Sequence, residues 1–301
     1  MTASISVVLR TKNGITTTRQ TLAALAAQSI QPLEWIVMDC RSTDGVRELA
    51  TSYGARIIDV DPDTYFPGKV LNRAAEAASG DLVVFVNSDT TPLLETSLEA
   101  LVRPLDDPEV AATFGRQVVR PEALGWVRGD YDAAFPAEGP APDWLPMSLP
   151  FSAIRRELLD AHPFYTDAWA SEDTEWGVRA RRAGLRIEYV PRAIAMHSHD
   201  YTLPEIRGRR YVEGEADAFI HPERRLGAAR LARRWASTVA RDLRIQWARS
   251  EWLEMLRTPL RRAVFWGAWA RGNRWGRTRR TRALADTGRG QRTILSLRRD
   301  A

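Results

Sequence analysis

Two neighbouring carboxylates and two histidines are the side chains of this sequence best suited to chemistry. Glu172 and Asp173 come first; His197 follows Asp173 by 24 residues, and His199 lies two positions further on. Carboxylates and imidazoles can accept a proton from a hydroxyl group, and both can bind a divalent metal ion. Ser171 is placed to cap a helix whose first turn carries the two acids, where the backbone dipoles favour negative charge.

The residues between the acids and the histidines predict the elements that position them. Gly184 is placed to end the helix, and residues 185–190 predict a strand. Pro191-Arg192 predicts a turn into a second extended piece that ends at the histidines. Residues two apart in an extended chain share a face, so His197 and His199 should point the same way. The pattern predicts that acid and imidazole meet at one rim. The alternative is a surface helix and a strand with two solvated histidines.

Apolar runs that alternate with helical patterns dominate the first half of the chain. This order predicts an α/β fold with a mostly parallel, doubly wound sheet, whose ligands bind beyond the carboxyl ends of the strands. Asp39 and Asp89 each follow a strand and should lie at that edge, unless they are turn or helix-capping residues. The first strand is not followed by Gly-x-Gly-x-x-Gly, which disfavours a dinucleotide-binding fold. The predicted strands are residues 5–9, 34–39, 55–59, 82–87, 110–114 and 150–154, the predicted helices include 16–28 and 69–78, and 120–150 is predicted as a long loop.

The composition restricts the compartment of the protein. The 301 residues include one cysteine, Cys40, which excludes a disulfide framework. The first residues lack the charged and apolar regions of a secretory signal, and we expect a cytoplasmic protein. The apolar run nearest to spanning length, residues 263–270, is far shorter than the roughly 20 residues that cross a bilayer.

Charge is distributed unevenly along the chain. Residues 223–301 contain 21 arginines and 6 acidic residues, whereas residues 1–222 contain 22 basic and 32 acidic residues. We therefore predict two domains, a catalytic domain over 1–222 and a basic, Trp-rich helical extension over 223–301. A basic extension with interleaved Trp also suits nucleic-acid binding, but the acidic first domain argues against that alternative.

The extension contains two amphipathic patterns. An apolar residue recurs every four positions at Leu231, Trp235, Val239 and Leu243, and Pro259 is placed to start a second helix with Trp and Arg residues. Trp and Arg on short helices are typical of the bilayer interface. We expect peripheral contact with the anionic inner face of the membrane. The alternative is that the stripe packs on the catalytic domain or on a second copy in a homodimer.

Several short motifs occur in a characteristic order over about residues 4–203. With these motifs the chain resembles the family 2 glycosyltransferases of the GT-A fold, and more loosely their rhamnosyltransferase-like bacterial members. Each motif alone is weak, but their order and spacing together are fairly specific. The motifs are residues 6–13, 37–39, 71–73, 79–89, 114–117, 171–173 and 197–199.

The resemblance implies roles for individual residues. Asp173, with Glu172 beside it, would be the catalytic base, and Asp89 would bind a divalent cation, Mn²⁺ or Mg²⁺. His197 is the second expected metal ligand, and His199 is an alternative ligand. The Asp-x-Asp of the family is here Asn87-Ser88-Asp89, and loss of the first carboxylate weakens the expected metal dependence. The expected donor-binding residues are Thr11 and Asp39 at the nucleoside, Lys69, Asn72 and Arg73 along the donor edge, and Ser88 and Asp89.

Glycosyl transfer needs these residue types for independent reasons. A carboxylate must accept the proton of the acceptor hydroxyl, and a counter-charge must stabilise the departing nucleoside diphosphate. We therefore expect an inverting, metal-assisted glycosyltransferase of cell-envelope polysaccharide biosynthesis that acts on a glycan or lipid-linked acceptor. The donor is a dTDP-, UDP- or GDP-sugar, with dTDP-rhamnose favoured by the resemblance. A sugar-phosphate nucleotidyltransferase is the alternative enzyme class, but it would need a Gly-rich loop after the first strand, where Arg10 to Gly14 contains one glycine.

Overall fold

The computed structural model describes residues 3–282 and divides them into two compact units. The first unit contains the described residues up to Arg120, together with Tyr131–Tyr165 and Asp173–Ser198. The second contains Pro121–Asp130, Thr166–Glu172 and the described residues from His199 onward. The boundary predicted from charge, between residues 222 and 223, lies inside this second unit.

The first unit is built on one mixed sheet of eight strands in the described residues, in the order β3-β2-β1-β4-β7-β6-β8-β5. The neighbouring pairs among β3, β2, β1 and β4 are parallel, as is β6 with β8, whereas β7 runs antiparallel to both of its neighbours. The central strands β1 and β4 form because an apolar run is bounded by polar residues. The strands are β1 (Ile5–Thr11), β2 (Glu34–Asp39), β3 (Arg56–Asp59), β4 (Leu82–Asn87), β5 (Thr91–Pro92), β6 (Val110–Val118), β7 (Phe151–Arg155) and β8 (Arg186–Met196).

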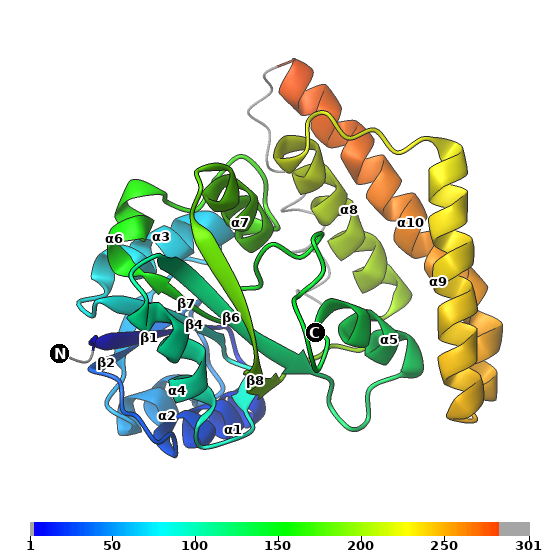
Figure 1. Ribbon diagram of the computed structural model, residues 1–301. Coiled ribbons are helices and arrows are strands. Elements are labelled where there is room, and N and C mark those ends of the chain that lie inside the picture. Colours follow the sequence, from blue (N-terminus) through cyan, green and yellow to red (C-terminus); the bar gives the residue numbers. More distant parts are fainter. Residues whose placement is uncertain (1–2, 283–301) are drawn as a thin grey trace. The chain divides into compact units, whose positions relative to one another are not determined.

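Helices cover both faces of this sheet (Figure 1). One apolar core lies between the sheet and α3, α6 and α7, where Phe85 and Trp176 both pack against Phe164. The second core lies between the opposite face and α1, α2 and α4, where Val84 meets Leu22. Alternate residues of each central strand enter opposite cores, as the pleat requires. The helices are α1 (Ile15–Ala26), α2 (Val46–Ser52), α3 (Pro67–Ala77), α4 (Ser97–Val102), α6 (Arg156–Ala161) and α7 (Glu172–Arg182), with a short 3₁₀ helix at Arg103–Asp106.

The sequence prediction was wrong at one place around the sheet: residues 120–150 contain the helix α5 (Gly125–Ala134) in place of an uninterrupted loop. The predicted break at Pro191-Arg192 is an irregularity within one strand, because the pairing of β8 with β6 passes from Val190 to Ile194 and then continues to Met196. Gly115 permits this irregularity, since a Cβ at that position would lie 2.5 Å from the Ala193 carbonyl oxygen.

The second unit contains α8 (Leu203–Ile220), α9 (Ala228–Ala248) and α10 (Trp252–Thr281). Glycine lets α8 and α10 approach closely, because a Cβ at Gly272 would overlap the Tyr211 carbonyl. The prediction that Pro259 starts a helix was wrong: Pro259 lies inside α10. Proline removes one backbone hydrogen bond there, but the buried Thr258 next to it bonds both Gln246 and the backbone of α10 and holds the helix together. Within residues 3–282, no helix is both long and apolar enough to cross a bilayer.

The apolar stripe of α9 packs inside the second unit. Val239 is buried, and the flanking Thr238 accepts a hydrogen bond from the indole of Trp266 on α10. Trp235 donates to the carbonyl of Pro259. The stripe therefore packs on α10 of the same unit, a partner that neither the membrane prediction nor its alternative named.

Candidate metal and nucleotide site

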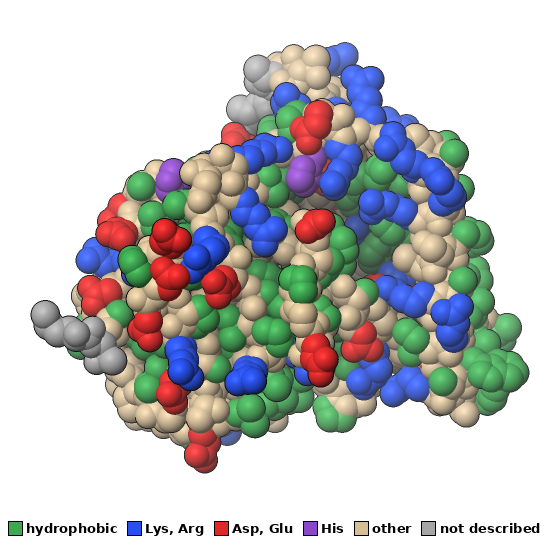
Figure 2. All heavy atoms as spheres, in the orientation of Figure 1, with side chains coloured by type: hydrophobic (Ala, Val, Ile, Leu, Met, Phe, Trp, Pro, Cys, Tyr) green, Lys and Arg blue, Asp and Glu red, His purple; other side chains and the backbone are tan. Residues whose placement is uncertain are grey.

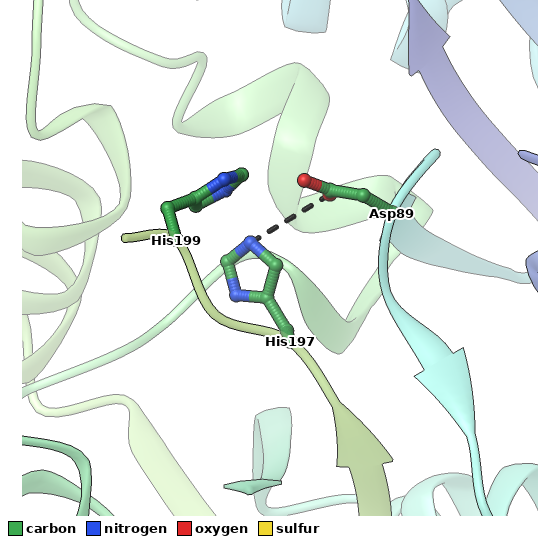
Figure 3. Close-up of side chains that lie close together, drawn as sticks. All are labelled: Asp89, His197 and His199. Carbon is green, nitrogen blue, oxygen red and sulfur yellow. Dashed lines mark ion pairs between the residues drawn. The ribbon is translucent and has the colours of Figure 1, made fainter. Parts of the chain in front are cut away.

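A carboxylate and an imidazole that are 108 positions apart in the sequence lie side by side (Figure 3). The short strand β5 brings them together, because Thr91 pairs with Met196 at the end of β8. Asp89 precedes β5 and His197 follows β8, so His197 Nε2 lies 3.6 Å from Asp89 Oδ1. One possible ligand atom from each of Asp89, His197 and His199 lies within 4.8 Å of the others.

A chain of hydrogen bonds fixes the orientation of the His197 ring. His197 is buried, and its Nδ1 lies 2.8 Å from Gln117 Oε1 and 3.3 Å from the hydroxyl of Tyr131. Gln117 donates its Nε2 to Ser148 Oγ over 2.8 Å, so its carbonyl oxygen faces the histidine and accepts from Nδ1–H. The remaining nitrogen, Nε2, then carries a lone pair on the side of Asp89.

The donor set fits a hard or borderline divalent cation. Carboxylate oxygen and neutral imidazole nitrogen are ligands of Mn²⁺, and the hydrogen bond at the other ring nitrogen is the usual way to orient a ligating histidine. Asp89 and His197, with His199, are the residues that would hold the ion. Asn87, in place of the first acid of the motif, accepts a hydrogen bond of 3.4 Å from Arg10.

Asp39 ends β2 and has one carboxylate oxygen in use and one without a partner. It is fully buried, and its Oδ2 accepts from the Ser42 backbone N–H at 3.0 Å and from Arg47 at 2.7 Å. Its Oδ1 is buried and has no hydrogen-bond partner among the described residues. A buried acceptor of this kind is costly unless a ligand donates to it. Thr11 is the register partner of Asp39 on β1, so both predicted nucleoside residues lie together at the carboxyl edge.

Asp173 lies in the first turn of α7. Its Oδ1 accepts from the Thr174 backbone N–H at 2.7 Å, and its Oδ2 accepts from the Leu149 N–H at 3.1 Å. The Thr174 hydroxyl also donates to Oδ1, over 3.4 Å. Ser171, at the turn into the helix, has φ +60°, a strained backbone for a residue other than glycine. Glu172 is half-buried beside Asp173. The meeting of Asp173 with the histidines stays a prediction.

The predicted donor-edge residues lie on α3 and in the turn after β4. Lys69 is exposed, and the guanidinium of Arg73 donates to the Asp59 carbonyl at 2.7 Å. Asn72 uses both ends of its amide on the backbone of Phe164, at 2.9 and 2.7 Å, so it anchors that segment. Ser88 is half-buried beside the candidate metal ligand. The donor-binding roles of these residues stay predictions.

Two side chains of the β6 strand extend the site beyond the sequence prediction. Gln117, which orients His197, appeared in the motif of residues 114–117 without a predicted role. Arg116 belongs to the same motif, and its Nε is buried with no partner among the described residues. Burial raises the pKa of the nearby Tyr189 to about 12, and the positive charge of Arg116 opposes that shift.

The family model that matches residues 6–170 is described as Glycosyl transferase family 2. The chain belongs to this family. It is 30% identical over 202 residues to the O-antigen chain rhamnosyltransferase WbaN of Salmonella anatum, an alignment that covers 63% of this chain and 64% of that protein. It is 27% identical over 224 residues to the O-antigen chain rhamnosyltransferase RfbN of Salmonella typhimurium, covering 69% of this chain and 70% of that protein. The chain thus spans less than two thirds of the first of these relatives.

Solved structures confirm the predicted α/β fold of the GT-A type. The mannosyltransferase PcManGT of Pyrobaculum calidifontis, in complex with GDP-Man and Mn²⁺, matches with a TM-score of 0.62 at 20% identity, covering 91% of this chain and 87% of that one. Glucosyl-3-phosphoglycerate synthase of Mycobacterium tuberculosis, in complex with Mn²⁺, UDP and phosphoglyceric acid, matches with a TM-score of 0.55 at 25% identity, covering 73% and 79%. The basic helical extension of the prediction is present as α9 and α10.

Proposed function

We propose that this protein is an inverting glycosyltransferase that moves a sugar from a nucleotide-sugar donor to a hydroxyl group. The observation that carries the proposal is the cluster of Asp89, His197 and His199 at the sheet edge of a family 2 chain. A bound divalent ion would neutralise the charge that develops on the departing nucleoside diphosphate. The ion is Mn²⁺, which both of the similar structures contain.

Asp39 and Asp173 bind the nucleoside and accept the proton, respectively. Asp39 binds the nucleoside, because its unpartnered buried Oδ1 accepts a hydrogen bond from the base or the ribose. Asp173 accepts the proton of the attacking hydroxyl, and its two backbone hydrogen bonds keep the carboxylate oriented. A base on the face opposite the leaving group gives one in-line displacement and inversion at the anomeric carbon.

The donor and acceptor follow from the relatives. Both are O-antigen chain rhamnosyltransferases, which supports dTDP-rhamnose as donor and a growing glycan, free or lipid-linked, as acceptor. The GDP-Man and UDP of the similar structures belong to those proteins. The proposed place of this enzyme is the synthesis of a cell-envelope polysaccharide.

An exposed apolar surface supports a peripheral position on the inner face of the membrane. The exposed side chains of Leu253, Leu256 and Leu260 recur along α10 with spacings of three and four, and we call them the leucine face. Trp247 and Trp252 are exposed nearby, with ring centroids 4.9 Å apart in an edge-to-face pair. Figure 2 shows hydrophobic side chains along the edge of the molecule where α9 ends and α10 begins.

The composition around this surface favours an anionic bilayer over a second copy of the chain. Residues 223–282 contain 17 arginines and 4 acidic residues. Two such surfaces repel each other, whereas each basic residue near an anionic leaflet contributes about 1 kcal/mol. The leucines and tryptophans would enter the headgroup region, where aromatic rings are favoured. The residues that contact the membrane therefore differ from the stripe predicted from the sequence.

A panel of nucleotides and nucleotide-sugars, tested with Mn²⁺ by thermal unfolding, examines the proposed function. A ligand at about 100 times its dissociation constant stabilises the native state by about 2.7 kcal/mol. We expect dTDP and dTDP-rhamnose to raise the melting temperature with Mn²⁺, and the rise to shrink in Asp89→Ala. The proposed site would be contradicted if no nucleotide raised the melting temperature, or if a nucleotide raised the melting temperatures of the wild type and of Asp89→Ala equally.

A further inference from the structure

Arginine side chains line a cavity of about 410 Å³ in the second unit. Figure 2 shows Lys and Arg side chains gathered over α9 and α10. The cavity is distinct from the residues of the candidate metal and nucleotide site, since every lining residue comes from the first turns of α9 or from the segment before it. We call it the arginine cavity; its lining residues are Arg224, Leu226, Arg230, Arg233, Arg234 and Ser237.

The helical repeat and one half-buried arginine of α10 build this cavity. Arg230, Arg233, Arg234 and Ser237 occupy positions i, i+3, i+4 and i+7 of α9, which place them on one face. Arg277 of α10 holds the segment that carries the remaining lining residues. Its guanidinium donates to the carbonyl of Pro222 at 3.1 Å and to the carbonyl of Arg224.

Arg277 is itself held in place by a chain of hydrogen bonds. Its Nε donates to Asn273 Oδ1 at 2.9 Å, and Asn273 Nδ2 donates to Asp217 at 3.1 Å. Arg277 therefore uses its donors on amide and backbone oxygens, and the segment from α8 to α9 is fixed before any ligand arrives. Such preorganisation lowers the entropic cost of binding.

The positive charges of the cavity have no carboxylate partner within residues 3–282. Among the described residues, none of the lining arginines forms an ion pair. Other arginines of the same unit are paired: Arg262 is fully buried between Asp130 and Asp242, and Arg241 contacts the same two acids. The arginines of the cavity therefore differ from these paired arginines, because no carboxylate among the described residues forms an ion pair with them.

The surroundings of Arg234 show the effect of this uncompensated charge. Burial lowers the pKa of Arg234, and the positive charges of Arg224, Arg210 and Arg230 lower it further, against the opposing effect of Asp217. The guanidinium also lies 5.5 Å from the centroid of the Trp266 ring, which restricts its position. An anion in the cavity would relieve the repulsion between these guanidinium groups.

We propose that the arginine cavity binds the diphosphate group of a ligand. A guanidinium presents a planar fork that matches phosphate oxygens, and four such forks can serve two adjacent phosphates. The volume is that of a small-molecule site, and Leu226 offers an apolar contact for an organic substituent. The diphosphate comes either as a free ion or attached to a lipid; the lipid source rests on the proposed function, whose acceptor is a glycan, free or lipid-linked.

Calorimetric titration of the full chain with inorganic pyrophosphate in EDTA tests the proposal. EDTA removes the metal ion from the donor site. Binding of pyrophosphate at that site therefore contributes little to the measured heat. The matched variants each remove two positive charges from exposed positions: Arg233→Gln/Arg234→Gln in the cavity, and Arg271→Gln/Arg274→Gln on α10. We expect the cavity variant to bind at least tenfold more weakly than the wild type, and the control variant to bind like the wild type.

A parallel titration with farnesyl diphosphate below its critical micelle concentration distinguishes the two sources. Tighter binding than pyrophosphate, lost in the cavity variant, identifies a lipid diphosphate, and equal binding identifies the free ion. Equal affinity of the two double variants, or no binding by the wild type at millimolar pyrophosphate, would overturn the proposal. Nucleotide stabilisation with Mn²⁺ is measured on the wild type and on both variants. Its absence from the wild type would instead contradict the proposed function, and its presence in both variants verifies that they fold.

Discussion

Replacement of Gln117 by leucine should weaken metal binding without touching a metal ligand. The Gln117 carbonyl oxygen accepts from His197 Nδ1 over 2.8 Å and so directs the lone pair of Nε2 toward Asp89. Loss of such an outer hydrogen bond typically costs ~10- to 100-fold in metal affinity, or about 1.4 to 2.8 kcal/mol. The Tyr131 hydroxyl, 3.3 Å from the same nitrogen, can partly replace the lost acceptor, so we expect a loss near tenfold.

Titration of Mn²⁺ followed by electron paramagnetic resonance measures this affinity directly, without relying on turnover. Gln117→Glu is the matched variant, because a carboxylate at the same place still accepts from Nδ1–H, and it should retain most of the affinity. Gln31→Leu controls for the substitution itself on an exposed side chain. Circular dichroism and thermal unfolding verify that the variants fold.

The reasoning fails if Gln117→Leu binds Mn²⁺ like the wild type while Asp89→Ala loses binding. The ring of His197 would then be oriented by packing alone. It fails equally if Gln117→Glu loses as much affinity as Gln117→Leu, because the accepting oxygen would then be irrelevant.

Three further predictions concern the proposed reaction and its location. Asp173→Asn should lower kcat by at least the ~10²-fold typical of lost general-base catalysis and leave nucleotide binding intact; near-normal turnover would remove the assigned role. Asp39→Ala should weaken nucleoside diphosphate binding by roughly 10- to 100-fold, since a hydrogen bond to a charged group contributes about 1.5 to 3 kcal/mol, and unchanged calorimetric affinity would leave it a turn residue. Serine at all three positions of the leucine face should abolish cosedimentation with anionic vesicles, whereas Leu33→Ser/Leu94→Ser should not. Equal cosedimentation of both variants would exclude the leucine face as the contact, and a shift from dimer to monomer would identify it as a dimer interface.

The first strands could be predicted closely because burial on both faces leaves a clear apolar run. Residues 34–39 and 82–87 were predicted and found as β2 and β4, and the run 5–9 extends to Thr11. The α5 helix could not be predicted, because Gly125 and Gly129 are poor helix formers. Tertiary packing selects that helix: a Cβ at Gly129 would lie 2.7 Å from the side chain of Ile245 on α9.

The sequence predicts which residues belong to the candidate site better than it predicts which of their side chains lie next to each other. Asp39 could be placed at the sheet edge because parallel strands end together. The contact of Asp89 with His197 depends on the two-residue strand β5, which is too short to give a periodic signal. Gln117 could not be assigned either, since a polar residue near the end of a strand gives no indication of the ring it will face. The arginines of the extension were equally ambiguous, because the sequence alone does not tell a buried pair such as Arg262–Asp242 from an exposed charge.

The glycine contacts between α8 and α10 determine how this protein can recombine with its relatives. The backbones of α8 and α10 contact each other directly at these glycines: Gly272 lies against the Tyr211 carbonyl, and Gly276 lies against the Glu215 carbonyl. The corresponding helix of a relative would place a side chain in this contact. A chimera joined at residue 223 would separate the two helices and place mismatched surfaces together. The helices must therefore be inherited as a pair, with the crossover near His199, and sequence changes at the three glycines should occur together with changes on the opposite helix. The glycines concerned are Gly214, Gly272 and Gly276.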